Sequence, residues 1–166
     1  MIIFDASTLI LLAKIDLLSI LSKEIDIVIT DTVKEESTVK KDLFDSKMIL
    51  SLIEKKNITV GSVKNISIMS DLMKDFNMDK GEASTLVLYQ EIHGELIATD
   101  DGQLIKAAKL MDIPFATSIT FLIRTAQKDL IQEKIALEKL KKLEKFGWYK
   151  ADIIEDAKKK IKGGEY

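Results

Sequence analysis

The 166-residue sequence contains no cysteine and only one histidine, His93. Without cysteine, the protein has no disulfide scaffold, no thiolate zinc site and no cysteine nucleophile. A single histidine excludes a metal site built from several histidines. Because His93 precedes Gly94 near the expected end of a helix, we interpret it as a structural residue. A metal site would therefore have to be built from oxygen ligands.

Proline, glycine, long apolar runs and excess positive charge are also scarce. One proline and seven glycines argue against long irregular loops. No apolar run approaches the roughly 20 residues of a membrane span, and Met1–Asp5 lacks the basic start of a signal peptide, so we expect a cytoplasmic protein with no membrane contact. The net charge of −2 excludes binding of nucleic acid by bulk positive charge. It allows a nucleic-acid substrate if cations neutralise an acidic site.

Short apolar runs alternate with amphipathic segments along a chain long enough for one domain. The expected strands are separated by helical segments, which predicts an α/β fold with a parallel sheet covered by helices on both faces. The carboxyl ends of parallel strands lie at one edge, where ligands bind. The expected strands are Ile2–Phe4, Ile25–Ile29, Ile58–Val60, Glu95–Thr99 and Ile113–Ala116.

Acidic residues follow these strands or begin the helices after them. Each one alone is explained as a helix cap or a first-turn acid, and Asp79 with Glu82 has the spacing of a capping box. Taken together, clustered carboxylates repel each other unless a cation lies among them. The cation that suits an all-oxygen site is Mg²⁺ or Mn²⁺, which can activate water for phosphodiester hydrolysis. The acids are Asp5, Glu35, Glu36, Glu82, Asp100 and Asp101.

Other phosphoryl-transfer enzymes on similar sheets need motifs that this sequence does not contain. A haloacid-dehalogenase-type phosphatase has Asp-x-Asp after its first strand, where Asp5-Ala6-Ser7 stands here. A P-loop nucleotide enzyme has Gly-x-x-x-x-Gly-Lys-Ser/Thr, which does not occur. A response-regulator receiver needs adjacent acids after its first strand, and these are also missing.

The order of four motifs resembles the PIN-domain family, in particular small prokaryotic ribonucleases that act as toxins of toxin–antitoxin pairs. The resemblance extends from about residue 1 to residue 123. The motifs are Ile3–Ile10 with the following Leu12–Leu18, then Val33–Glu36, then Asp79–Ala83, and finally Ala98–Asp101. A proline that often precedes the second acid is replaced by Thr30-Asp31. Glycines that many relatives have after the last strand are replaced by Ala116-Thr117-Ser118.

The resemblance implies a three-layer α/β/α sandwich and a metal-dependent endoribonuclease. Its catalytic acids map to Asp5, Glu36, Glu82 and Asp101, and its Mg²⁺ or Mn²⁺ ligands to Asp5, Glu82, Asp100 and Asp101. The last acid falls on the pair Asp100-Asp101, and both remain candidates. Secondary candidates are Ser7, Glu35 and Thr99. The implied partners are RNA, an antitoxin and a second copy of the chain. The alternative is an inactive PIN-like module that binds RNA or protein.

The helices after about residue 130 have no counterpart in this reading. We therefore expect a PIN-like nuclease domain over residues 1–129. We expect residues 130–166 to form a C-terminal helical extension packed on the domain or on a partner. Trp148 and Tyr149 are interpreted as packing anchors, with stacking on RNA bases as the alternative. The lysines of this region, including Lys139, are interpreted as a solvated face or as phosphate contacts.

Overall fold

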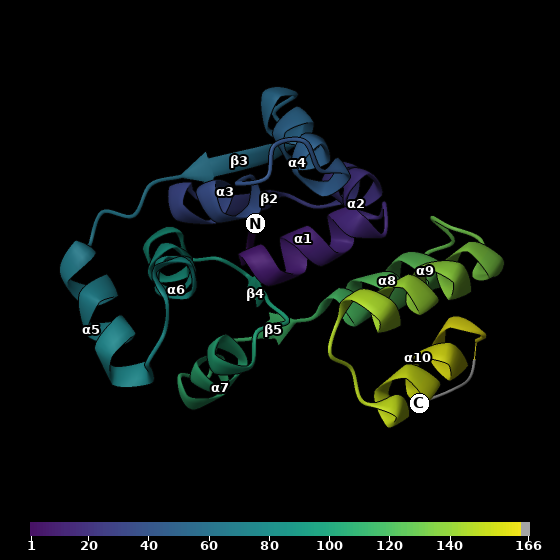
Figure 1. Cartoon of the computed structure of the whole chain (residues 1–166). Helices are drawn as coiled ribbons and strands as arrows, with labels where there is room; N and C mark the ends of the chain where they lie inside the picture. Colours follow the sequence, from purple (N-terminus) through teal and green to yellow (C-terminus); the bar gives the residue numbers. More distant parts are fainter. Residues whose placement is uncertain (164–166) are drawn as a thin grey trace.

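A central parallel sheet organises the computed structural model, which describes residues 1–163. Its five strands are arranged in the order β3-β2-β1-β4-β5, and every neighbouring pair is parallel (Figure 1). This confirms the predicted fold class. The strands are β1 (Ile2–Phe4), β2 (Ile27–Thr30), β3 (Ile58–Gly61), β4 (Leu96–Ala98) and β5 (Phe115–Ala116).

Helices connect the strands and extend the chain beyond the sheet. Seven of them lie in the first 117 residues, as short amphipathic segments between strands. Three more follow β5 within the part of the chain that the structure describes. They are α1 (Ala6–Lys14), α2 (Leu18–Glu24), α3 (Asp31–Ser37), α4 (Phe44–Glu54), α5 (Ile66–Phe76), α6 (Lys80–Ile92), α7 (Gly102–Leu110), α8 (Ser118–Gln127), α9 (Glu133–Phe146) and α10 (Ala151–Ile161).

Alternation along the strands divides the core into two sides. Ile2 and Phe4 of β1 belong to one hydrophobic cluster, whereas Ile3 between them belongs to another. The same alternation separates Ile97 from Ala98 in β4. Successive side chains of a strand point to opposite faces, so both faces of the sheet are buried. The molecule is therefore a three-layer α/β/α sandwich.

Different helices cover the two faces. Residues of α1, α2, α4 and α8 share one cluster with Phe4, whose ring stacks on Phe121 at 5.3 Å between centroids. Residues of α5, α6 and α7 form the core on the opposite face. Helix α3 contacts both α1 and α6 at the edge of the sheet. This position of α3 brings the acids of one helix layer close to those of the other.

The C-terminal helices pack on the first of these faces. Figure 1 shows α8, α9 and α10 together on one side of the molecule, away from α5 and α6. Apolar residues of α9 and α10 belong to the same cluster as Leu9 and Leu12 of α1. They are Ala136, Leu140, Leu143, Ile154, Ala157 and Ile161. The division of the chain at residue 129 stays a prediction.

The structure corrects several expected boundaries. The strand expected over Ile25–Ile29 is Ile27–Thr30, and that over Ile113–Ala116 is reduced to its last two residues. The helix expected from Leu130 begins at Glu133. The sequence also predicts a frayed tail over residues 163–166, which lies outside the described residues except for Gly163. Among residues 1–163, no helix combines the length and the apolar character needed to cross a bilayer.

The sequence predicts that a helix stops at Gly94, but the residue that ends α6 is His93, one position earlier. His93 itself takes the left-handed conformation that ends α6, with φ 52. Gly94 is needed for space instead, because a Cβ there would lie 2.8 Å from Tyr89 and 3.0 Å from Ile3. His93 therefore has the structural role that the sequence indicated.

Candidate active site

The predicted site lies at the point where the order of the sheet changes direction. From β1 the chain builds β2 and β3 toward one edge, whereas β4 and β5 lie on the other side of β1. The carboxyl ends of β1 and β4 are neighbours, and Asp5 and Thr99 follow them directly. Open α/β sheets bind ligands in the crevice at such a switch point.

Asp5 is buried at the carboxyl end of β1, with 4% of its surface exposed. It caps the N-terminus of α1, which confirms the capping interpretation. Its Oδ2 accepts hydrogen bonds from the Ser7 amide (3.3 Å), the Ser7 hydroxyl (2.6 Å) and the Thr99 hydroxyl (3.2 Å). Burial raises the pKa of the Asp5 carboxyl, although these hydrogen bonds act in the opposite direction. None of the three bonds uses Oδ1.

Ser7 and Thr99 connect Asp5 to the pair of acids after β4. The Ser7 hydroxyl accepts a hydrogen bond from the Asp100 amide at 3.0 Å. The Thr99 hydroxyl accepts one from the Asp101 amide at 3.0 Å. Each hydroxyl therefore donates to Asp5 and accepts from the backbone of the pair. Ser7 and Thr99, the secondary candidates, therefore link the residues that follow β1 to those that follow β4.

Asp100 is engaged by four hydrogen bonds. Its Oδ2 accepts from the Thr8 hydroxyl (2.6 Å) and from the amide (2.9 Å) and hydroxyl (2.5 Å) of Ser118. Its Oδ1 accepts from the Tyr149 hydroxyl at 2.6 Å. Burial, followed by the charge of Asp100, raises the pKa of Tyr149. Asp100 thus ties α1, α8 and the C-terminal region to the end of β4.

Asp101 has a different environment. Its Oδ1 caps α7 by accepting from the amides of Gln103 (2.7 Å) and Leu104 (2.9 Å). Asp101 also lies within hydrogen-bonding reach of the Glu82 side chain. Of the two adjacent acids, Asp101 is the one whose carboxylate lies beside a second predicted acid.

Glu82 combines a local and a long-range role. Its Oε2 accepts from the Asp79 amide (3.0 Å), and its own amide donates to Asp79 Oδ1 (2.9 Å). This is the capping box that the spacing predicted. Partial burial raises the pKa of Glu82 to about 7, and the hydrogen bond and negative charge of Asp101 add to the rise.

Glu36 extends from α3 to the start of α6. Its carboxylate lies against the backbone of Gly81, where a Cβ would be only 2.2 Å from Oε2. Partial burial raises the pKa of Glu36 to about 7, and repulsion from Asp79 and Asp5 adds to the rise. Glu35 lies next to it on α3 and contributes a smaller repulsion. Because α3 begins at Asp31, neither glutamate belongs to the first turn, which corrects that part of the sequence interpretation.

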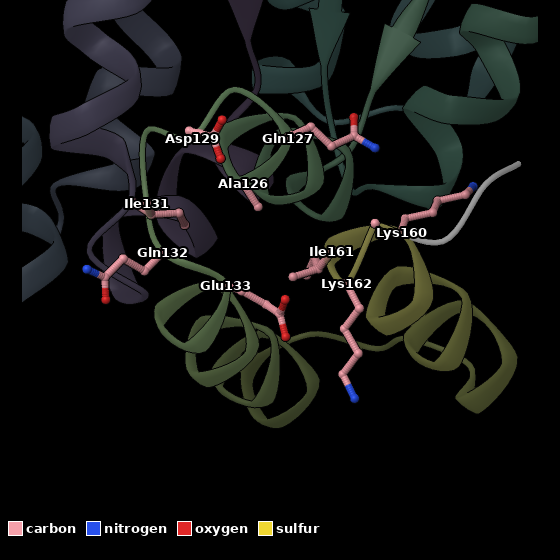
Figure 2. Close-up of a pocket in the computed structure, with 10 residues that line it drawn as sticks. Ala126, Gln127, Asp129, Ile131, Gln132, Glu133, Lys160, Ile161 and Lys162 are labelled. Atoms are coloured by element: carbon pink, nitrogen blue, oxygen red, sulfur yellow. The ribbon is translucent and has the colours of Figure 1, made fainter.

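A pocket of about 300 Å³ opens beside these acids. Ser7, Asp100 and Asp101 line one part of it, and Phe146, Trp148 and Tyr149 line another. A second pocket, of about 540 Å³, lies between the ends of α8 and α10 and the start of α9 (Figure 2). Glu133 and Lys162 line that second pocket, and it includes none of the predicted site residues.

The donor set fits a divalent cation in its chemistry. It consists of carboxylate and hydroxyl oxygens, the ligands that Mg²⁺ and Mn²⁺ prefer. The ion pairs found in residues 1–163 do not involve Asp5, Glu36, Glu82 or Asp101. Within the same residues, however, no group of three acidic or histidine side chains is arranged to hold a metal ion. The acids instead form two smaller groups. Glu36 lies near Asp5 and Asp79, and Glu82 lies near Asp101.

Comparison with known proteins identifies the family. A family model described as a PIN domain matches residues 1–162, so the chain belongs to the PIN-domain family. Members are generally nucleases, bind nucleic acid and typically use divalent metals. Searches of curated proteins and of solved structures returned no significant match. The match includes all of α9 and α10.

Three polar residues bind one of the predicted acids in a way that the sequence analysis did not foresee. Thr8, Ser118 and Tyr149 all bind the Asp100 carboxylate. Thr8 and Ser118 follow the ends of β1 and β5, a position that could have indicated them. No local signal points to Tyr149, because its contact with Asp100 joins residues 49 positions apart.

The structure agrees with the sequence interpretation of one C-terminal side chain and disagrees with that of two others. Tyr149 is anchored by its bond to Asp100, as expected of a packing residue. Trp148 is fully exposed, so its interpretation as a packing anchor was wrong. Lys139 is buried and donates to the Ile15 and Asp16 carbonyls, so it is neither a solvated residue nor a phosphate contact.

Proposed function

We propose that this PIN-domain protein is a metal-dependent endoribonuclease that hydrolyses RNA phosphodiester bonds. The observation that carries the proposal is the buried Asp5 carboxylate at the switch point, close to Glu36 and held by the hydroxyls of Ser7 and Thr99. Burying a carboxylate among other carboxylates costs free energy unless a cation offsets the charge. The acids therefore support a site that is completed by a divalent ion.

The proposed metal ligands are Asp5, Glu82 and Asp101, with Asp100 retained as the fourth candidate. Asp101 fits better than Asp100, because four hydrogen bonds already engage both oxygens of Asp100. A bound Mg²⁺ or Mn²⁺ would supply charge stabilisation and a more acidic water. Loss of the ion would leave the carboxylates uncompensated.

The chain's own residues have distinct roles in this proposal. Ser7 and Thr99 orient Asp5 through its Oδ2. A carboxyl group whose pKa lies near neutrality is suited to accept a proton from an attacking water. Glu36 and Glu82 both meet this condition, with pKa values of about 7. Glu35 is the neighbouring alternative to Glu36.

The test is cleavage of a labelled mixed-sequence RNA with Mg²⁺, with Mn²⁺ and with chelator. Asp5→Asn should abolish metal-dependent cleavage, because it removes the charge while asparagine still caps a helix well. Asp71→Asn makes the same change at an exposed position of α5 and should cleave like wild type. Circular dichroism would show that both variants fold.

Cleavage that persists in folded Asp5→Asn would contradict the assignment. A folded wild type that binds RNA or protein but cleaves nothing under any metal condition would favour the inactive binding module. A growth defect in cells that requires Asp5 would support the further proposal, made on the resemblance alone, of a cytoplasmic toxin restrained by an antitoxin. Sedimentation would test the proposed homodimer.

A further inference from the structure

The segment between α9 and α10 combines exposed aromatic rings with lysines. Its sequence is Lys145-Phe146-Gly147-Trp148-Tyr149-Lys150. Phe146 is 44% exposed, and the Trp148 side chain is as exposed as in an extended peptide. Aromatic faces interleaved with cations are the features by which proteins hold single-stranded nucleic acid.

Contacts on both sides of Trp148 hold this segment beside the acids. Tyr149 donates its hydroxyl to Asp100, one of the residues that follow β4. The Tyr149 ring lies so close to Gly147 that a Cβ there would be 2.4 Å from it. On the other side, the Lys14 ammonium of α1 lies 5.5 Å from the centre of the Phe146 ring. The chain is therefore anchored on both sides of the exposed Trp148.

This anchored segment forms part of the wall of the pocket beside the acids. Phe146, Trp148 and Tyr149 line the same pocket as Ser7, Asp100 and Asp101. Its volume of about 300 Å³ is at the lower end of the range of small-molecule sites. One occupant would thus touch both the aromatic segment and the acids that follow β4.

The charges of the pocket restrict what can occupy it. A phosphate group would be repelled by the carboxylates of Asp100 and Asp101. A nucleobase is neutral, has a face for stacking and has edges that can hydrogen-bond to hydroxyl and carboxylate oxygens. Cations for the attached phosphates are present next to the pocket, on the exposed side chains of Lys14 and Lys150.

We propose that Trp148 is a stacking platform that holds one base of a single-stranded RNA beside the acids. The choice of RNA rests on the proposed function, whereas the stacking rests on the exposure and position of Trp148. Because Tyr149 is bound to Asp100, the platform and the end of β4 form one connected unit. The C-terminal segment thereby becomes part of the substrate-binding site.

Trp148 is the only tryptophan of the chain, so its fluorescence reports directly on this pocket. The wild-type protein, in chelator to prevent cleavage, is titrated with a short unstructured RNA. A matched abasic oligomer, which has the same phosphates and no bases, is titrated in parallel. Stacking should quench the fluorescence with the RNA and not with the abasic oligomer.

Affinity for the same labelled RNA is then compared among variants. Trp148→Ala should bind about 5- to 150-fold more weakly, the range that corresponds to loss of one stacked base. Trp148→Phe should regain part of this affinity. Leu110→Ala removes a similarly exposed side chain, 68% exposed at the far end of α7, and should bind like wild type.

The proposal is overturned if the RNA does not bind, if both oligomers give the same fluorescence, or if Trp148→Ala keeps wild-type affinity. Unchanged RNA affinity of Trp148→Ala would favour contact of the exposed tryptophan with a protein partner instead. The outcome is separable from that of the proposed function. RNA binding that depends on Trp148 without any cleavage would contradict only the proposed nuclease activity. Equal cleavage by wild type and Trp148→Ala would contradict only the proposed stacking role of Trp148.

Discussion

Gly81 determines where the Glu36 carboxylate lies. Glycine is usually unfavourable inside a helix, and alanine at the same position would stabilise α6. The structure gives a reason for the glycine, because an alanine Cβ would lie 2.2 Å from Glu36 Oε2. The missing side chain therefore leaves space for a carboxylate that belongs to another helix.

Gly81→Ala should reduce RNA cleavage while leaving the stability of the fold nearly unchanged. Its free energy of unfolding should stay within about 1 kcal/mol of wild type, since the displaced group is the end of a flexible side chain. Cleavage should fall on the order of 100-fold, because Glu36 would be displaced by about 1 Å or more. Denaturant unfolding and RNA cleavage measure the two effects.

Gly102→Ala is the matched control for this prediction. Gly102 begins α7 directly after Asp101, and a Cβ there would meet no atom within 4 Å. It should therefore cleave like wild type. Full activity in Gly81→Ala would show that the position of Glu36 does not matter for catalysis.

At the scale of elements, one buried lysine connects α9 to the end of α1. The Lys139 ammonium donates to the carbonyl oxygens of Ile15 (2.6 Å) and Asp16 (2.9 Å). Carbonyls at a helix C-terminus lack partners within the helix and carry partial negative charge, so a cation is favourable there. Burial nevertheless lowers the pKa of Lys139. The same α1 begins at Asp5, so this contact links the C-terminal helices to the helix of the site.

Lys139→Met should destabilise the protein by about 1–3 kcal/mol, because it leaves the buried Ile15 carbonyl without a hydrogen bond and removes the bond to the Asp16 carbonyl. Methionine keeps most of the apolar stem, so packing is largely preserved. Lys142→Met, on the exposed side of the same helix, should change the free energy of unfolding by less than about 0.5 kcal/mol. Equal urea midpoints for the two variants would show that the contact contributes nothing.

At the scale of the whole molecule, folding gathers acids from distant segments. Glu36 and Glu82 have pKa values of about 7 in the folded protein, against an ordinary value of 4.5. The unfolded chain loses these protons near pH 4.5, whereas the folded chain keeps them until about pH 7. The folded state therefore binds more protons across this window, and raising the pH destabilises it.

In chelator, the thermal unfolding midpoint should fall as the pH rises from about 4.5 to about 7, and level off above that. Glu36→Gln should make this dependence shallower, because it removes one of the two groups. Glu54→Gln, at the exposed end of α4, should keep the wild-type slope. A midpoint that rises across the window would contradict the pKa assignment.

Several features of the site could be predicted because they depend on residues close in the sequence. Asp5, Asp79 and Asp101 each cap a helix through amides two or three positions away. The alternation of short strands and helices likewise predicted the parallel sheet and placed the acids at its carboxyl edge. Strand ends were less well predicted, because pairing with neighbours, rather than β-branched composition, decides where a strand such as β2 begins and ends.

The sequence by itself determined the fold class, the helix caps and the placing of acids directly after the strands, because these follow from local spacing and side-chain alternation. Only the tertiary structure decided which acids become neighbours. The order of the strands brings Asp5 beside Thr99, and the packing of α3 against α6 brings Glu36 to Gly81. It also decided that Asp100 is enclosed by Tyr149 while Trp148 faces solvent, because that depends on how the C-terminal helices pack over residues far away in the chain.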